Sequence, residues 1–312
     1  MSDALVDGFV SLFRGRADVI GVFGEKDEVT GKRAGGCVRQ PLTRNHFVKH
    51  LTSSNPADWI GVYPCIGDKC SWGCVDLDGT DDPTVARHIQ SLLGHKNITS
   101  WVERSEGGFH VWVFPEDPLV PSAVMRRALM AASLAAGFTP KEVNPKAEDV
   151  GKGPGNYVRL PFPGVLSLNP PEIRVVNAYG GAPTGARGDL YFPDFIHNAN
   201  NLRAKTLDLE SVAALYTPPP TASIAVGEVP PLDKALTDKL SPIAWTVYSK
   251  GPLDGSDRSG TMTRLAHLCA ESGLTADEAY AILAHVDGTW GKHFLDRPNG
   301  GELLVKIVER AY

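Results

Sequence analysis

Residues 74–80, Cys-Val-Asp-Leu-Asp-Gly-Thr, place two carboxylates at the end of a short apolar strand. Side chains alternate between the two faces of a strand, so Asp76 and Asp78 point to one side. Val75 and Leu77 then point to the other side, into a core. Two like charges on one face repel each other. The commonest reason for such a pair is a bound divalent cation, because Mg²⁺ prefers carboxylate and phosphate oxygens.

A second interpretation of this pair is that both carboxylates face a loop and cap the helix that follows. Asp81 and Asp82 stand directly before Pro83, a pattern typical of a helix start, and they already supply that cap. Asp76 and Asp78 are therefore available for another role.

Length and composition indicate a soluble globular protein. The chain has 312 residues, enough for two domains or one large one. No apolar run approaches the roughly 20 residues that a membrane span requires, so we expect no membrane partner. No basic region followed by an apolar stretch opens the chain, and we expect a cytoplasmic location. Five cysteines, an odd number, indicate a reducing compartment rather than a disulfide framework.

One segment is locally basic although the chain carries a net charge of −5, which argues against a uniformly basic nucleic-acid-binding protein. No acidic residue lies between Glu28 and Asp58, and His46 and His50 add further donors there. The segment is a candidate DNA-binding surface, with a solvated surface loop as the alternative. Its basic residues are Lys32, Arg33, Arg39, Arg44 and Lys49.

The spacing of apolar residues predicts mixed α and β structure up to residue 215. We expect a helix, a turn and a strand over 12–23, helices at 83–93, 122–136 and 207–215, and strands at 59–63, 74–77, 100–103, 109–114, 141–144 and 157–160. Strands 100–103 and 109–114 form a hairpin. Residues 163–194 are rich in Pro and Gly, with little pattern beyond 173–176.

The composition changes after residue 215. A Pro-rich, small-residue stretch predicts a linker over 216–235, and helical periodicity follows at 261–271 and 302–310. Thr275 and Glu278 form a capping box that opens another helix. We therefore expect an α+β domain over 1–215, a linker over 216–235 and a small all-α domain over 236–312.

A second motif, residues 105–112, has the sequence Ser-Glu-Gly-Gly-Phe-His-Val-Trp. Its glycines let the backbone approach a ligand closely. His110 begins a strand beside this turn, where it can donate hydrogen bonds to phosphate oxygens. Trp112 and Phe114 share its face, with Val111 and Val113 behind. A histidine on a strand more often has a structural role. The functional interpretation of this motif therefore depends on its position after Asp76 and Asp78.

A third element covers residues 141–161. Glu142 is a candidate to complete a three-carboxylate metal site with Asp76 and Asp78, with Glu148 and Asp149 as rivals. The alternative for Glu142 is an exposed strand carboxylate. Candidate contacts to a nucleotide or a template in this element are Lys146, Asn156 and Arg159.

Together these elements resemble the archaeo-eukaryotic primase superfamily, in its primase-polymerase branch, and most closely the primase domains of phage, plasmid and mobile-element replication proteins. That family shows two acidic residues separated by one apolar residue, a Ser/Gly-x-His motif on a strand, and a third strand carboxylate. Segments 12–19, 61–64 and 155–161 also resemble mobile-element members, and the likeness covers roughly residues 10–170. The matching positions are Asp76, Asp78, Ser105, His110 and Glu142, although the loop between Ser105 and His110 is slightly short.

The resemblance implies a primase-polymerase catalytic domain, with mixed sheets, flanking helices and an RRM-like core. It implies a DNA primase and DNA polymerase that uses dNTPs or NTPs on single-stranded DNA, with two Mg²⁺ or Mn²⁺ ions on Asp76, Asp78 and Glu142. The helical tail resembles the accessory C-terminal domains of such primases, and a replicative helicase domain or subunit is an implied partner. The implied nucleotide contacts are Ser105, Gly108, His110, Lys146, Asn156, Arg159 and Arg16.

Three alternatives stay open at this point. Residues 76–80 also match the opening motif of haloacid-dehalogenase-type phosphatases, in which Asp76 would be the nucleophile. A catalytically weak replication-origin or single-stranded-DNA-binding module is a non-enzymatic alternative. Cys65, Cys70 and Cys74 suggest a zinc site as a third alternative. Their spacing does not give the closely spaced cysteine pairs that are typical of structural zinc sites, so we favour buried thiols.

Overall fold

The computed structural model describes residues 3–26, 33–140, 142–151, 153–168, 172–177, 188–217, 232–252, 258–291, 294–297 and 300–312. The chain divides into two compact units, Met1–Thr217 and Pro218–Tyr312. Most of the predicted linker, residues 218–231, lies outside the described residues.

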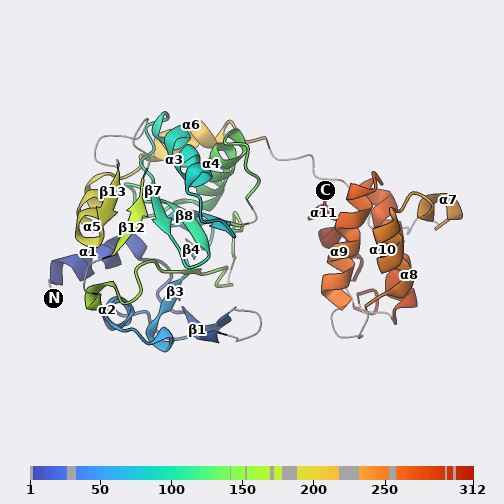
Figure 1. The fold of residues 1–312 in the computed structure, drawn as a ribbon, viewed down its shortest axis with the longest axis horizontal. Helices are drawn as coiled ribbons and strands as arrows, with labels where there is room; N and C mark the ends of the chain where they lie inside the picture. Colours follow the sequence, from blue (N-terminus) through green and yellow to red (C-terminus); the bar gives the residue numbers. More distant parts are fainter. Residues whose placement is uncertain are drawn as a thin grey trace. The chain divides into compact units, whose positions relative to one another are not determined.

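A six-stranded sheet forms the centre of the first unit, in the order β10-β6-β8-β7-β12-β13 (Figure 1). All neighbouring strands in it are antiparallel. The predicted strand at 74–77 is β6, and the predicted hairpin is β7 with β8, so these expectations are confirmed. The six strands are β6 (Gly73–Asp78), β7 (Trp101–Arg104), β8 (Gly108–Val113), β10 (Glu142–Asn144), β12 (Ile173–Val176) and β13 (Asp189–Tyr191).

Helices cover one face of this sheet. Val75 and Leu77 of β6 and Val111 of β8 point to that face and pack in one core with the helices, as strand alternation predicts. Figure 1 shows these helices above β7 and β8. They are α3 (Thr84–Gly94), α4 (Ser122–Ala135) and α6 (Thr206–Ala213).

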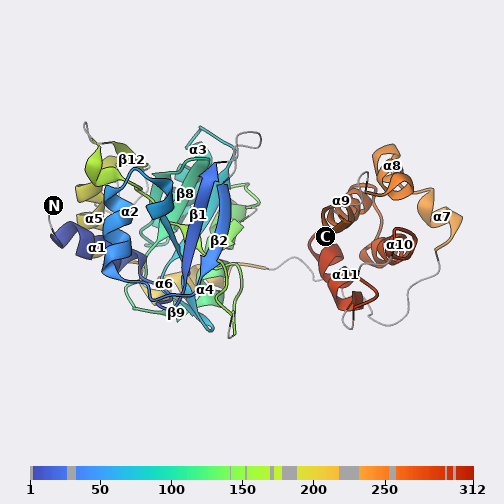
Figure 2. The same cartoon turned by 90° about the horizontal axis from the view of Figure 1, so that it is seen from below.

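The opposite face carries an aromatic core that a second sheet and three helices enclose. Phe13 packs edge-on against Trp112 and Phe114, with ring centroids 5.1 Å apart in each pair. The second sheet has the order β11-β3-β1-β2, and Figure 2 shows β1 and β2 side by side. The enclosing elements are α1 (Asp3–Phe13), α2 (Arg44–Thr52), α5 (Phe192–Asn201), β1 (Ile20–Lys26), β2 (Arg33–Val38), β3 (Ile60–Val62) and β11 (Val158–Arg159).

The smaller elements connect these layers. A short three-stranded sheet has the order β4-β5-β9. Its strands are β4 (Cys65–Ile66), β5 (Lys69–Cys70) and β9 (Val120–Pro121), and two 3₁₀ turns are η1 (Pro56–Asp58) and η2 (Val165–Ser167).

Several elements of the first unit were not predicted from the sequence. Helix α1 begins at Asp3 rather than near residue 12, and α2, β2 and α5 were missed. The basic segment is therefore not one surface loop. Helix α2 is polar on average and buries only Phe47, His50 and Leu51, too narrow a stripe to stand out in the sequence.

The second unit is all-α, as predicted. The predicted capping box is present: the Glu278 N–H donates to Thr275 Oγ1 (3.3 Å) and the Thr275 N–H donates to Glu278 Oε2 (2.8 Å). Figure 2 shows the helices around their shared core. They are α7 (Lys234–Thr237), α8 (Pro242–Lys250), α9 (Arg258–Glu271), α10 (Ala276–Thr289) and α11 (Gly300–Glu309). Over the residues that the structure describes, no helix has the length and apolar character to cross a membrane.

His50 is expected to make folding of the first unit sensitive to acid. It is fully buried, its Nδ1 accepts from the Ile60 N–H, and its Nε2–H donates to the Pro161 carbonyl. Burial lowers its pKa from 6.5 to about 4, so below pH 6.5 the unfolded chain binds the extra proton and the folded chain does not. The free energy of unfolding should fall by up to about 1.4 kcal/mol per pH unit across this window.

Urea unfolding at several pH values between 7 and 4 measures this contribution. Because other groups also titrate there, the test is the difference between the wild type and His50→Gln, which carries no titrating group at this position. The variant should show a flatter dependence on pH; equal slopes for the two proteins would contradict the assignment.

Candidate active site

A row of ionisable side chains crosses the six-stranded sheet. Glu142 of β10 pairs with Asp76 of β6, Asp76 pairs with His110 of β8, and His110 pairs with Glu103 of β7. Residues directly opposite each other on neighbouring antiparallel strands carry their side chains on the same face. Asp78 lies two residues beyond Asp76 on that face, opposite Gly108. The register therefore brings the two predicted motifs together.

Asp76 is the most constrained carboxylate of the row. Its side chain is 19% exposed, and its Oδ1 is buried without a hydrogen-bond partner, 3.6 Å from His110 Nε2. Burial raises the pKa of Asp76, the positive charge of His110 opposes that rise, and the neighbouring carboxylates add to it. A buried carboxylate oxygen without a partner costs free energy, which indicates a site prepared for a cation or a donor group.

The His110 ring is held by Glu103. His110 Nδ1 lies 2.8 Å from Glu103 Oε2, and because a carboxylate oxygen only accepts, Nδ1 carries the proton. Burial lowers the pKa of His110, but the hydrogen bond and charge of Glu103, with the charge of Asp76, outweigh it and leave the pKa raised. When the ring is protonated, it has a second N–H to donate on its other side, at Nε2.

Close packing of the backbone leaves no room for a side chain at Gly108. A Cβ on this residue would lie 2.0 Å from the Leu77 carbonyl oxygen, which is backbone of the neighbouring strand. The turn is closed by hydrogen bonds from Ser105 N–H to Gly108 O (2.9 Å) and from Gly79 N–H to Gly107 O (2.8 Å). Gly108 thus holds the His110 strand against the end of the carboxylate strand.

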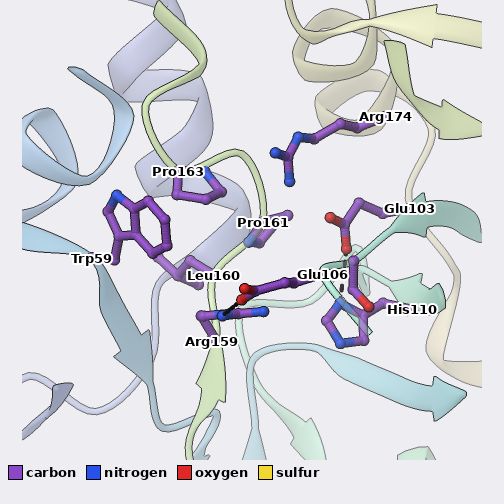
Figure 3. Close-up of a pocket in the computed structure, with 10 residues that line it drawn as sticks. Trp59, Glu103, Glu106, His110, Arg159, Leu160, Pro161, Pro163 and Arg174 are labelled. Atoms are coloured by element: carbon purple, nitrogen blue, oxygen red, sulfur yellow. Dashed lines mark hydrogen bonds and ion pairs between the residues drawn. The ribbon is translucent and has the colours of Figure 1, made fainter. Parts of the chain in front are cut away.

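A cavity of about 220 Å³ opens beside His110 (Figure 3). Arg159 and Arg174 line it, together with Ser105 and Glu106. Arg159 Nη1 donates to Glu106 Oε2 at 2.5 Å. Figure 3 shows Trp59 on the side opposite the histidine. Two guanidinium groups and an imidazole at one cavity form a surface suited to an anionic ligand.

The structure gathers some of the predicted nucleotide contacts and separates others. Ser105, His110 and Arg159 line the same cavity. Lys146 donates to Glu142 Oε1 at 2.6 Å, so it neutralises the predicted third carboxylate. Arg16 lies at a different, open hollow that it lines with Arg39, and it pairs with Asp18. Asn156 is exposed in the loop before β11.

The predicted DNA-binding residues lie in different environments. Arg44 pairs with Asp3 and Asp7 of α1, each at 2.7 Å. Lys49 lies 3.9 Å from Asp58. Lys32 falls outside the described residues, as does the side chain of Arg33. His50, which was expected to add a donor at the surface, is buried in the core instead.

Sequence reasoning missed three residues at the cavity: Glu103, Arg174 and Trp59. A signal for Glu103 was available, because the turn of the predicted hairpin fixes the pairs Arg104–Phe109 and Glu103–His110. No signal of that kind existed for Trp59 or Arg174, which reach the cavity from segments distant in the sequence.

The residues of the row fit a divalent cation by their chemistry. Asp76 and Asp78 offer hard oxygen ligands on one face, and Asp76 Oδ1 has no other partner. In the part of the chain that the structure describes, however, no three His, Cys, Asp or Glu side chains are already gathered as a metal site. Cys65, Cys70 and Cys74 are buried free thiols, and burial raises the pKa of each.

Comparison with known protein families assigns the first half of the chain to a family. The family model for the archaeo-eukaryotic primase domain of the TOTE conflict system matches residues 4–166. The chain belongs to this family. The predicted membership of the archaeo-eukaryotic primase superfamily is therefore confirmed, and the family supports a primase-type function with nucleotide and nucleic-acid substrates. It favours that function over a phosphatase with Asp76 as nucleophile.

Other comparisons add little to this assignment. No curated protein matches the chain. Among solved structures, the crystal structure of primase RepB′ is 12% identical, with 99% of this chain and 94% of that chain covered and a TM-score of 0.27.

Gly108→Ala should destabilise the first unit, because the new Cβ meets backbone of β6 that can move only if the strand pair separates. The expected loss is about 1–3 kcal/mol in the free energy of unfolding, measured by urea denaturation. Gly107→Ala is the matched control, because its Cβ would meet only the end of the Asp78 side chain at 3.0 Å. Equal stability of the two variants would show that the close approach at Gly108 is not required.

Proposed function

We propose that the protein is a template-directed nucleotidyltransferase, a DNA primase and DNA polymerase that makes and extends primers on single-stranded DNA. The observation that carries this proposal is the row of ionisable side chains on the large sheet. In it, Asp76 has a buried carboxylate oxygen without a hydrogen-bond partner, 3.6 Å from His110 Nε2. Membership of the archaeo-eukaryotic primase family supports the same reaction class.

Asp76 and Asp78 are the residues proposed to hold divalent metal, Mg²⁺ or Mn²⁺, with Glu142 as the third carboxylate. Metal held by these residues would supply positive charge that favours attack of the 3′-hydroxyl on the α-phosphate and departure of pyrophosphate. Glu142 lies directly opposite Asp76 but pairs with Lys146, so it must exchange this partner to serve as a ligand. Lys146 would then be released to contact the nucleotide, as the family resemblance implies.

The cavity beside His110 is the proposed site of the incoming triphosphate. His110 and Arg159 offer N–H donors there, and Ser105 offers a hydroxyl. A triphosphate would compete with Glu106 for Arg159, because phosphate and carboxylate oxygens bind a guanidinium in the same way. Trp59 would form an apolar wall for the base or sugar, since it lines the cavity opposite His110.

The two units have separate proposed roles. Residues 1–215 form the catalytic domain, and residues 236–312 form a helical accessory domain after a linker at 216–235. The accessory domain is proposed to hold the template or the initiating nucleotide, because a primase must bind two nucleotides and a template without a primer. A replicative helicase domain or subunit is a proposed further partner.

The Asp76→Asn/Asp78→Asn double variant should lose nucleotide incorporation. The carboxamides keep the shape of the carboxylates but remove both negative charges, which eliminates several kcal/mol of transition-state stabilisation, or roughly 10³-fold in rate. The measurement is incorporation of labelled dNTPs or NTPs on single-stranded DNA in Mg²⁺ or Mn²⁺, with and without a primer.

Asp81→Asn provides the control, because it removes an exposed carboxylate that lies just after the same strand. This variant should incorporate nucleotides like the wild type. A double variant that folds and still extends a primer at the full rate would overturn the proposed role of the two aspartates.

Removal of residues 231–312 should reduce initiation more than extension. The first unit has its own cores and the complete row of ionisable side chains, so the shortened chain should still extend a supplied primer. The comparison is the ratio of unprimed to primed product for the full and shortened chains on one template. Equal loss of both activities would contradict a role for the second unit in initiation.

A further inference from the structure

We propose that Glu103 is a positioning residue for His110, which fixes the orientation of the imidazole ring at the nucleotide cavity. This inference rests on the proposed function, because His110 is there a phosphate contact. Glu103 lies on β7, outside both motifs that the sequence singled out, and it does not need to touch the substrate to act.

The side chains of Glu103 and His110 are in direct contact. Glu103 Oε2 accepts the His110 Nδ1–H at 2.8 Å, and it also accepts the Trp112 Nε1–H at 3.4 Å. The Trp112 ring stands nearly perpendicular to the His110 ring, with centroids 5.2 Å apart. Carboxylate and indole therefore both contact the imidazole, and Figure 3 shows the contact with Glu103.

The buried position of Glu103 is costly for a carboxylate. Its side chain is only 2% exposed, and residues of this sheet face pack among the large aromatic side chains of the core. Burial of a carboxylate is unfavourable unless it is paired and hydrogen-bonded, so an apolar residue would serve packing better. The pairing with His110 explains why an acidic residue occupies this position.

The contact with Glu103 also restricts the His110 ring. With Nδ1 committed to Glu103, the remaining nitrogen, Nε2, lies 3.6 Å from Asp76 Oδ1, and the ring lines the cavity. Without Glu103, the ring can rotate or carry its proton on Nε2 alone. A carboxylate behind a functional histidine commonly fixes orientation in this way.

The test compares Glu103→Gln and Glu103→Leu in the full chain. Glutamine keeps an acceptor for the Nδ1–H, whereas leucine removes it and keeps an apolar side chain in the core. Equilibrium binding of dATP, measured without template, should weaken roughly 10- to 100-fold in Glu103→Leu and less in Glu103→Gln. In primer extension, the KM for dATP should rise more than kcat falls. Glu210→Gln, on the exposed surface of α6, should bind dATP like the wild type.

A double-mutant cycle separates positioning from a general loss of structure. In the His110→Ala background, the Glu103→Gln change should weaken dATP binding no further, because Glu103 acts through the histidine. Additive losses, or unchanged binding in both Glu103 variants with His110 intact, would overturn the inference. Urea unfolding of each variant identifies any that fail to fold, and Glu103→Gln then remains as the conservative test.

Nuclear magnetic resonance of the His110 ring nitrogens gives a readout that does not depend on activity. At one fixed pH, Nδ1 should be protonated in the wild type and in Glu103→Gln, and Nδ1 should lose its proton in Glu103→Leu, where no acceptor holds it. If the protonation of the ring nitrogens is unchanged in Glu103→Leu, this result alone overturns the positioning role. If the ring changes but His110→Ala binds dATP normally, the proposed nucleotide contact of His110 fails instead.

Discussion

The antiparallel register of β10, β6, β8 and β7 is the constraint on which the candidate site depends. It places Glu142, Asp76, His110 and Glu103 in one row, although they come from four segments of the chain. A slip of one residue would turn Asp76 away and expose the apolar side chains behind it. Those apolar residues pack under α3 and α4, so hydrophobic burial on one face fixes the polar chemistry on the other.

Charge in this site is balanced by local pairs. Glu103 pairs with His110, Lys146 with Glu142, and Arg159 with Glu106. Two of these pairs are partly exposed and can exchange partners at little cost, whereas the Glu103–His110 pair is buried and is costly to break. Asp76 Oδ1 is different, because it is buried and has no hydrogen-bond partner. A buried oxygen without a hydrogen-bond partner lowers the stability of the fold, and such costs are typical of functional sites.

Sequence patterns that span only a few neighbouring residues predicted the local structure well. Strand alternation assigned Asp76 and Val75 to opposite faces, and the capping box at Thr275 starts a helix as expected. Contacts between residues far apart in the sequence were predicted less well. The basic segment was treated as one surface, but Arg44 pairs with α1 and His50 is buried. Charge in the sequence does not reveal which acidic residue will fold against it.

The sequence by itself determined the elements that carry the acidic pair and the histidine, because a period of two residues decides which side chains share a strand face. It also indicated the family through the order of these motifs, and the family match confirmed it. Only the tertiary structure decided that Glu103 lies behind His110, that Lys146 covers Glu142, and that Arg16 lines another hollow. These contacts depend on strand register and loop paths, which depend on the packing of the whole core.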